Sequence, residues 1–526
     1  MSSDHPVDKN SKQPPDRPHR RKPGDIHALE QLAREIRVYR DSCGTLWVDA
    51  PKNRALRLEA NESRDYLARV CLKMYGRRPT KAAIDALLSR LREKAQTGSP
   101  VDVPIRIAAI RAGSGFDLLG GDRIVLDLAD TQEQFVEVSL DGVSVTPYCK
   151  SSFYRPAALL PLAQPCLHRD VNLRQALAPV LPFPEDDPRA VVVAVWLLGA
   201  LFPLIPQPIL MIVGQQGSGK SVLAKALREM IDPNGSPVRR PPDSERDLFI
   251  AGASSYVLVF DNLTGIGKHL ADALCAISTG GGYSTRKLYT NDEEVVFKMR
   301  RPVILTSIDP VTVNPDFLDR TLLLELSALR EKTSILKLEE TQEDCKPRVL
   351  GAALLSLYDA LAERSLGNVE RPKDPHRLVD LHELALLAAR SMYFGWTPDF
   401  VDRALRSNRD EVRQFAADAS PIVSLVTALA REGFEGTATQ LLTKLEALAP
   451  KIQARRGDLP RSPEELGRAL KRAEPILHDN GVIVERKRDR TSARERLIKL
   501  YLSGSNGAGV VRKRISLSLA TDRKQQ

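Results

Sequence analysis

The chain has 526 residues, which is too many for one ordinary hydrophobic core and predicts about three folded units. Apolar residues make up 42% of the sequence, which is enough for globular packing. The six cysteines include no C-x-x-C pair, a spacing that fits neither a zinc site nor a disulfide framework and is typical of a reducing cytoplasm. The N-terminus lacks the apolar stretch of a signal peptide.

The formal charge of +10 is concentrated at the C-terminal end of the chain. Residues 451–526 hold 19 Lys and Arg against 9 Asp and Glu, whereas residues 1–25 carry a net charge of +2 and the rest of the chain −2. A cationic region on a near-neutral body predicts a polyanionic partner, with nucleic acid ahead of an anionic membrane. The alternative is a surface that only keeps the protein soluble.

Two regions are predicted before residue 166. Residues 1–25 are rich in Pro, Lys, Arg and Asp and poor in apolar residues, which predicts a disordered basic tail. Residues 26–165 predict a small α+β domain, and the sequence does not define its role. Its expected elements are two helical stretches followed by short strands: Ala28–Tyr39, Ser63–Leu91, Arg123–Leu128, Phe135–Leu140 and Val143–Val145.

Residues 166–346 predict an α/β core with a parallel sheet. One apolar stretch, Val191–Val213, is long enough to cross a bilayer. Prolines such as Pro206 interrupt it and a glycine loop follows, so we expect a buried helix and a buried strand, with no membrane contact. Four apolar runs have the length of buried strands: Ile209–Val213, Tyr256–Phe260, Val303–Leu305 and Thr321–Leu326.

The core contains a candidate phosphate-binding loop that matches G-x-x-x-x-G-K-[ST]. Glycines let backbone N–H groups surround phosphate oxygens, and the next helix presents its N-terminus to the anion. Lys220 would neutralise the β- and γ-phosphates of ATP, and the Ser221 hydroxyl would bind Mg²⁺. An apolar strand precedes the loop and a helical sequence follows it. The loop residues are Gly214, Gln215, Gln216, Gly217, Ser218, Gly219, Lys220 and Ser221.

Further candidate residues follow the other predicted strands. Asp261 comes after the run Tyr256–Phe260, where a carboxylate would hold the metal through water, although it could simply begin a turn. Asn262 comes next, and its amide can orient a water molecule but cannot accept its proton. Thr306 ends another strand and could reach the γ-phosphate, and a plain strand end is the alternative. Arg320 could act on a neighbouring subunit's ATP, or pair within the chain with an acid such as Asp316 or Asp319.

These residues occur in an order that resembles AAA+ ATPases, specifically a bacterial and phage group of replication ATPases near the superfamily 3 helicases. The stretches that carry the resemblance are GQQGSGKS, VLVFDNLTGI, ALCAISTGGGYSTRKLYTNDEEVVF, RPVILTSID and NPDFLDRTLLLEL, with weaker matches continuing to Leu502. The sequence departs from the family pattern at Asn262, where glutamate is common, and at Thr306, where asparagine is frequent. Both departures put the rate of hydrolysis in doubt, but not nucleotide binding.

The resemblance implies a homo-oligomeric ring, expected to be a hexamer, that moves along or opens DNA. It implies that Gly280–Phe297 is a hairpin facing the channel, with Arg286 and Lys287 as DNA contacts, or else as an ordinary solvated pair. Arg320 aligns with the family's arginine finger, and Arg348 could match an arginine of the lid that senses nucleotide.

The C-terminal part predicts a DNA-binding domain. Residues 347–419 predict a helical lid or linker, residues 420–503 a winged helix, and residues 504–526 a second basic tail. Ser462-Pro463-Glu464-Glu465 is a helix start, and a charged hairpin follows that helix. A winged helix used for protein contacts is the alternative. The candidate DNA contacts are Arg468, Lys471, Arg472, Arg486, Lys487 and Arg488.

Together these features predict an ATP- and Mg²⁺-dependent ATPase that translocates on or unwinds DNA during replication of a phage, plasmid or integrated element. The resemblance implies single-stranded or forked DNA as partner, a primase or other replication protein as a further partner, and the cytoplasm of a bacterial or phage-infected cell as location. The alternative function is an ATP-gated DNA-binding switch or loader without unwinding, which Asn262 favours. A small-molecule kinase is a third class, against which Arg320 and the basic tail argue.

Overall fold

The computed structural model describes residues 26–503, apart from 112, 114–116, 169, 287–293, 309–313, 329–333, 369–370, 373, 375–376, 420, 450–458 and 489–495. The chain divides into two compact units. The first comprises Met1–Pro104 with Ser152–Tyr154, and the second comprises Ile105–Ser151 and Arg155–Gln526. The predicted segment 26–165 therefore contributes to both units. The two predicted basic tails lie outside the described residues.

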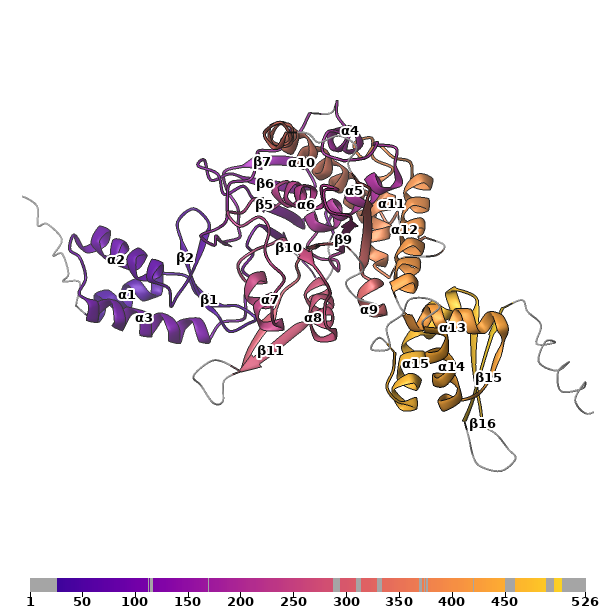
Figure 1. Ribbon diagram of the computed structural model, residues 1–526. Helices are drawn as coiled ribbons and strands as arrows, with labels where there is room; N and C mark the ends of the chain where they lie inside the picture. The colour runs from indigo at the N-terminus through magenta and orange to yellow at the C-terminus, as the bar shows by residue number, and fades with distance from the viewer. Residues whose placement is uncertain are drawn as a thin grey trace, which may run out of the picture. The chain divides into compact units, whose positions relative to one another are not determined.

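The first unit packs three helices against a four-stranded sheet (Figure 1). The strand order is β1-β2-β3-β8, in which β8 runs parallel to β3 and the other pairs are antiparallel. The elements in chain order are α1 (Ile26–Glu35), β1 (Val38–Arg40), β2 (Leu46–Ala50), β3 (Arg54–Arg57), α2 (Asn61–Tyr75), α3 (Lys81–Gln96) and β8 (Phe153–Tyr154).

The helical stretch predicted at Ser63–Leu91 is two helices, because local signals break it. Gly76 ends α2 in the left-handed conformation, with φ of 71°, which glycine adopts without steric cost. The Thr80 side chain then caps α3 by accepting a hydrogen bond from the Ala83 N–H at 3.2 Å. The stretch Ala28–Tyr39 was also predicted too long, because Val38–Arg40 pairs with β2 as a strand.

The second unit begins with an antiparallel sheet of order β4-β5-β6-β7. The three strands predicted in this region are confirmed. The strands are β4 (Ile107–Ile110), β5 (Arg123–Asp127), β6 (Phe135–Ser139) and β7 (Gly142–Thr146).

The centre of the second unit is a four-stranded parallel sheet of order β10-β13-β9-β14. All four predicted buried strands belong to it, so the expected α/β P-loop core is confirmed. Its strands are β9 (Ile209–Gly214), β10 (Leu258–Leu263), β13 (Val303–Ser307) and β14 (Thr321–Leu326). Every residue of β13 is buried, as expected for a central strand covered on both faces.

Helices cover both faces of this sheet (Figure 1). On one face, alternate strand residues such as Met211 and Leu305 share a core with α7 (Glu245–Gly252) and α8 (Lys268–Thr279). On the other face, α6 (Lys220–Glu229) packs on β9, β10 and β13. Because the sheet is buried on both faces, its strands read as continuous apolar runs.

Helix α5 (Pro188–Leu201) is the buried helix predicted before the first strand of the sheet. Asp187 caps it by accepting a hydrogen bond from the Arg189 N–H at 2.9 Å, and its residues from Ala190 to Leu201 are all buried. In the described part of the chain, no helix is long and apolar enough to cross a membrane.

Polar groups cover both edges of the parallel sheet. On β14, the Asn408 side chain accepts a hydrogen bond from the Leu323 N–H at 3.1 Å and donates one to the Leu323 carbonyl at 2.6 Å. The Arg189 guanidinium donates to the Glu325 carbonyl of the same edge at 2.8 Å. On β10, the Arg239 backbone pairs with the strand in a single parallel bridge. These partners satisfy backbone groups that edge strands otherwise leave open.

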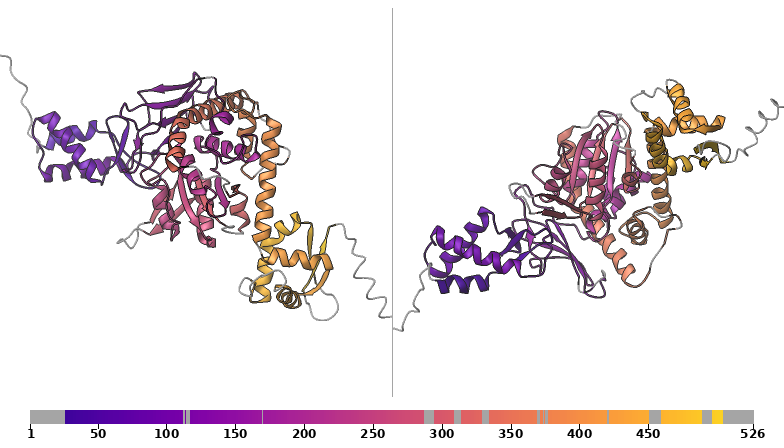
Figure 2. Two further views of the ribbon diagram at one scale, coloured as in Figure 1. Left: turned by 45° about the horizontal axis from the view of Figure 1, so that its top comes forward. Right: turned by 90° about the horizontal axis from the view of Figure 1, so that it is seen from below.

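A largely helical segment follows the sheet. Helix α12, seen along its length in Figure 2, carries Asn408 and leads into the C-terminal elements. The Gly351 position of α10 lies so close to the Cys166 carbonyl that an added Cβ would stand 1.8 Å from its oxygen, so only glycine fits there. The helices are α4 (Leu173–Leu177), which precedes the sheet, α10 (Ile335–Ser365), α11 (Val379–Ala388) and α12 (Pro398–Ala419).

The C-terminal elements are three helices and a three-stranded antiparallel sheet of order β15-β17-β16, which is the layout of a winged helix. The sequence predicted the helices and the β16–β17 pair but missed β15, which has only four residues, one of them a glycine. The elements are α13 (Pro421–Glu432), β15 (Phe434–Thr437), α14 (Ala438–Leu448), α15 (Pro463–Asp479), β16 (Val482–Arg488) and β17 (Arg496–Leu502).

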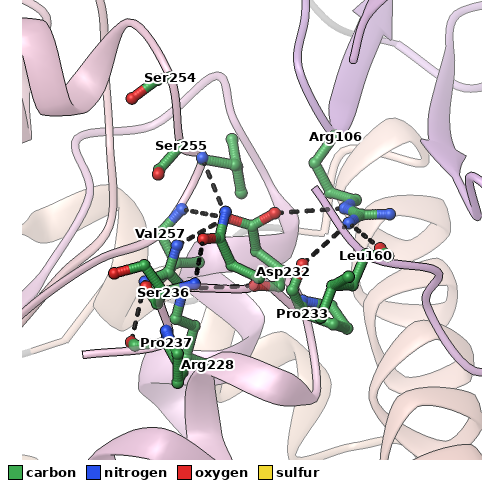
Figure 3. Close-up of polar contacts among 12 residues, drawn as sticks. Arg106, Leu160, Arg228, Asp232, Pro233, Ser236, Pro237, Ser254, Ser255 and Val257 are labelled. Atoms are coloured by element: carbon green, nitrogen blue, oxygen red, sulfur yellow. Dashed lines mark hydrogen bonds and ion pairs between the residues drawn. The ribbon is translucent and has the colours of Figure 1, made fainter. Parts of the chain in front are cut away.

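A buried ionic cluster joins the β4–β7 sheet to the P-loop core (Figure 3). Its centre is Asp232, which forms an ion pair with Arg106 at 3.3 Å and another with Arg228 at 3.7 Å, and all three side chains are fully buried. Asp232 also accepts hydrogen bonds from the N–H groups of Tyr256 and Val257, both at 3.0 Å, just before β10 begins. Burial lowers the pKa of Arg228 to about 10, although the nearby carboxylate opposes this shift.

Candidate nucleotide-binding site

The predicted phosphate-binding loop joins the end of β9 to the start of α6. Gly214, Gly217 and Gly219 all have positive φ, at 152°, 83° and 85°. A Cβ at Gly214 would stand 2.3 Å from the Leu326 carbonyl oxygen of the neighbouring strand, so no side chain fits. The loop therefore needs glycine at these positions for conformation and, at Gly214, for space.

The Lys220 side chain lies across the loop. Its ammonium group donates hydrogen bonds to the carbonyls of Gly214 at 2.7 Å and Gln215 at 2.8 Å, and the residue is 9% exposed. Ser218 is buried, and its hydroxyl has no hydrogen-bond partner among the described residues. Among the described residues, the hydrogen-bond partners of the Lys220 ammonium are thus neutral carbonyls.

Three predicted site residues meet at the carboxyl ends of neighbouring strands. The Ser221 hydroxyl lies 2.8 and 3.0 Å from the two carboxylate oxygens of Asp261, to which it donates. The Thr306 hydroxyl also donates to Asp261. Ser221 comes from α6, Asp261 from β10 and Thr306 from β13, so the fold brings together residues that are 40 and 45 positions apart in the sequence.

Asn262 has an unusual backbone conformation next to this group. Its φ is 61°, in the left-handed region that asparagine tolerates better than most residues, and the register between β10 and β13 shifts at this point. Its N–H donates to the Thr306 hydroxyl at 2.9 Å, and its side chain is exposed. Thr306 is fully buried, and its hydroxyl thus accepts from Asn262 while it donates to Asp261.

The donor set fits a magnesium nucleotide. Mg²⁺ prefers oxygen ligands, takes few of them from the protein, and keeps several waters. Ser221 and Asp261 place a hydroxyl and a carboxylate together with no cation paired to that carboxylate in the described residues. The left-handed glycines and Lys220 form the loop that phosphate oxygens would occupy.

Arg320 is held within its own chain. Its guanidinium donates to the Asp316 carbonyl at 2.6 Å and forms an ion pair with the Asp316 carboxylate at 2.5 Å. This is the intramolecular pair that the sequence left open as an alternative. The Arg377 side chain, which sequence reasoning missed, also pairs with Asp316, at 2.7 Å, and with Asp319 at 3.3 Å. Arg320 is 14% exposed and Arg377 is 46% exposed.

The structure places Arg348 on α10, with its side chain exposed and within 3.9 Å of the Cys345 sulfur. Another α10 residue makes the contact with the phosphate-loop helix: Lys346 pairs with Glu229 of α6 at 2.9 Å and also with Glu343. Burial lowers the pKa of Lys346, but these two carboxylates outweigh it and leave the pKa above its ordinary value. No motif in the sequence singled out this lysine.

The predicted DNA-contact residues of the hairpin lie at the margin of the described part. Strands β11 (Gly282–Arg286) and β12 (Glu294–Lys298) form the expected antiparallel pair. Arg286 is the last residue of β11, whereas Lys287 lies outside the described residues.

The predicted DNA-contact residues of the winged helix occupy two elements. Arg468 and Lys471 are exposed on α15, and Arg486 and Lys487 are exposed on β16. The Arg486 guanidinium lies 2.9 Å from a carboxylate oxygen of Glu474. The last two candidates belong to α15 and β16, but their side chains lie outside the described part: Arg472 and Arg488.

The parallel sheet, its glycine loop and the Ser221–Asp261 pair define the chain as a protein with a P-loop core. Two family models match by sequence. The first, "Actinomycete integrative conjugative element replication protein", matches residues 177–392, and the second, "AICE RepA C-terminal domain", matches residues 419–513. Together they cover more than half of the chain, which therefore belongs to the replication proteins of actinomycete integrative conjugative elements.

Comparison with curated proteins gives no match. Among solved structures, one described as "SCCmec type IV Cch - active helicase" is 14% identical, with a TM-score of 0.46, and the match covers 89% of this chain and 93% of that chain. Another, "The A form apo structure of NrS-1 C terminal region-CTR", is 11% identical, with a TM-score of 0.37, and the match covers 92% of this chain and 99% of that chain. Likenesses at this level carry no argument about activity.

Proposed function

We propose that the protein is an ATPase that uses ATP and Mg²⁺ to move along or unwind DNA when the mobile element replicates. The observation that carries the proposal is the contact of Ser221 with Asp261 beside Lys220, at the carboxyl ends of parallel strands. Ligands of open parallel sheets bind at this edge. Membership of a family of replication proteins supports DNA as the second partner.

Each residue of the site has a proposed task. Lys220 exchanges its two carbonyl partners for phosphate oxygens, which removes the cost of leaving a buried cation without strong partners. Ser221 and Asp261 would hold Mg²⁺, and the ion would supply positive charge next to the phosphates. Thr306 positions both Asp261 and the Asn262 backbone through its single hydroxyl. Asn262 would orient the attacking water through its amide.

The test is the rate of ATP hydrolysis with and without single-stranded DNA, followed by strand displacement on a forked duplex. Stimulation by DNA together with displacement is the expected result. Lys220→Ala should lose hydrolysis and serves as the negative control. The proposal that the protein moves along DNA would be contradicted if the protein bound DNA but DNA did not stimulate ATP hydrolysis and no strand was displaced.

A ring in which Arg320 acts on the neighbouring subunit's nucleotide can be tested by mixing. Arg320→Ala and Lys220→Ala should each be inactive alone, and together they should recover part of the activity, since some interfaces then contain both native residues. To reach the nucleotide, Arg320 would have to break its ion pair with Asp316. Arg377, which also pairs with Asp316, would still neutralise that carboxylate. Arg377→Ala, mixed in the same way with Lys220→Ala, is the matched control. An absence of recovery by Arg320→Ala at every mixing ratio would count against a shared site.

The second candidate function is an ATP-gated DNA-binding switch or loader. Asn262 favours it, because an exposed amide stands where a proton acceptor would speed hydrolysis. This candidate predicts that ATP changes DNA affinity at a protein concentration where strand displacement is absent. Equal DNA affinity with and without ATP would exclude it.

A further inference from the structure

Helices α2 and α3 of the first unit carry an exposed basic surface around the turn that joins them. It consists of five side chains, all exposed, which we call the α2–α3 basic surface: Arg69, Lys73, Arg77, Arg78 and Lys81. Between Asp65 and Asp85 the sequence contains these five cations and no acid. The two helices pack against each other (Figure 1), and the five cations lie in the second half of α2, in the turn and at the first residue of α3.

The other cations of these helices have partners, whereas these five have none among the described residues. Arg64 pairs with Asp85 at 2.7 Å, and Lys94 donates to three backbone carbonyls near the end of α1. Two further ion pairs bind α3 to α1 and to the segment after β3: Arg90–Glu30 and Arg92–Glu59. In the described part of the chain, no member of the α2–α3 basic surface forms an ion pair. Asp65 is four residues from Arg69 on α2, but the two side chains do not pair.

The arrangement costs stability. Arg69 and Lys73 are four residues apart on α2, and like charges at that spacing on a helix cost roughly 0.2–0.5 kcal/mol. Lys81 lies in the first turn of α3, where its charge opposes the helix dipole, and that turn contains no acid. Solubility alone needs no such concentration of one sign, since interspersed charges also provide it.

Apolar side chains are also exposed on the same stretch of α2. Leu72 is 38% exposed and Met74 is 43% exposed, on either side of Lys73. Exposed apolar groups next to cations can contact the sugars and base faces of a strand whose phosphates meet the cations.

We propose that the α2–α3 basic surface binds the sugar–phosphate backbone of DNA, so that the first unit holds a DNA strand independently of the ATP site and of the winged helix. Charge complementarity favours DNA over a neutral partner, since five unpaired cations would each meet a phosphate. A bilayer would also attract cations, but membrane-surface helices bury a broad apolar face, and α2 instead turns its apolar residues Leu67 and Cys71 into its own core.

The test is DNA binding by the full-length triple variant Lys73→Gln/Arg77→Gln/Arg78→Gln without nucleotide, which makes the result independent of ATP hydrolysis. Fluorescence anisotropy with a mixed-sequence single-stranded DNA of 30 nucleotides measures affinity at several salt concentrations. Each lost phosphate contact lowers the salt slope by about 0.7, so we expect a slope smaller by about 2 and an affinity at least tenfold weaker at low salt.

The matched control removes the same charge from other exposed positions: Arg34→Gln/Lys150→Gln/Lys337→Gln. Its affinity should change less than twofold, since neither α2 nor α3 is altered. Equal losses in the two triple variants would overturn the proposal, because the effect would then be one of net charge. Binding to phosphatidylserine vesicles is measured for the same variants. The proposal would also be overturned if the first variant bound these vesicles more weakly but bound DNA as tightly as the native protein.

Photocrosslinking supplies a second readout at the level of peptides. Single-stranded DNA that contains bromodeoxyuridine should crosslink to peptides from α2 and from the start of α3 in the native protein. Crosslinks confined to the second unit would overturn the proposal even if the affinity of the variant falls.

Discussion

Two aspartates hold the two ends of strand β10, and their partners differ in kind. Asp232 binds the backbone just before the strand and pairs with two buried arginines, and it is itself fully buried. Asp261 lies in the strand, is partly exposed, and accepts hydrogen bonds from two hydroxyl groups. A carboxylate among fixed cations is neutralised by the fold, whereas one among hydroxyls keeps its charge available for a metal ion.

The comparison separates structural from chemical use of the same side chain. Both aspartates help to place β10, and both are reached from α6, since Arg228 and Ser221 lie in that helix. The helix and the strand are therefore fastened at one end by ion pairs and at the other end by exchangeable hydrogen bonds. Substitutions at the two ends should affect different properties.

The largest expected effect is on folding, at Asp232. Asp232→Asn leaves Arg106 and Arg228 buried without a counter-charge, which should lower the free energy of unfolding of the second unit by about 3–5 kcal/mol. Chemical denaturation followed by tryptophan fluorescence measures it, in a Trp47→Phe background so that the signal comes from the second unit. Asp243→Asn, at an exposed position, is the control and should change stability by less than about 0.5 kcal/mol.

The opposite pattern is expected at Asp261. Asp261→Asn removes the charge that would hold the metal but strands no buried cation, so ATP hydrolysis should fall at least a hundredfold, or about 2.7 kcal/mol. The same denaturation experiment should show a stability change under about 1 kcal/mol. A stability loss as large as that of Asp232→Asn would remove the distinction between the two aspartates.

A smaller effect is expected at Thr306, which acts through its two neighbours. Thr306→Val keeps the shape but removes the hydroxyl, and kcat for ATP should fall about tenfold, or about 1.4 kcal/mol, with KM nearly unchanged. Thr306→Ser retains the hydroxyl and should recover most of the rate. An unchanged kcat in Thr306→Val would mean that Asp261 needs no help from β13.

The smallest expected effect concerns the backbone at Asn262. Because φ is 61°, Asn262→Ala should be about 1 kcal/mol less stable than Asn262→Gly, which adopts this conformation without strain. Thermal unfolding measures the difference. Steady-state hydrolysis by the same two variants shows whether the amide contributes: equal rates in both variants and the native protein would exclude a role in catalysis.

Sequence patterns predicted the features whose signals are local. The glycine loop, the apolar strand before it and the helix after it are contiguous, so the P-loop and the parallel sheet could be predicted. Gly76 and Thr80 carried a local signal for the break between α2 and α3, but the apolar periodicity on both sides obscured it. Strand β15 was missed because a four-residue segment containing Gly436 has a weak strand pattern.

The features that sequence patterns did not predict depend on distant partners. Arg106 and Asp232 are 126 positions apart, and nothing in either segment indicates the other. Strand β8, at Phe153–Tyr154, pairs with β3 about a hundred residues earlier, as its register shows. The roles of the nucleotide-site residues remain predictions. Their positions were predicted correctly, because Ser221 and Asp261 are in contact at the carboxyl ends of neighbouring strands.

The covered edges of the parallel sheet have a consequence for self-association. An open edge strand is a template on which another copy can add its own strand, and such additions are slow to reverse. Asn408 and Arg189 occupy that template on β14, and the Arg239 backbone occupies it on β10. Contacts between copies in the proposed ring would therefore have to use side chains and loops, which can form and release without unravelling the sheet.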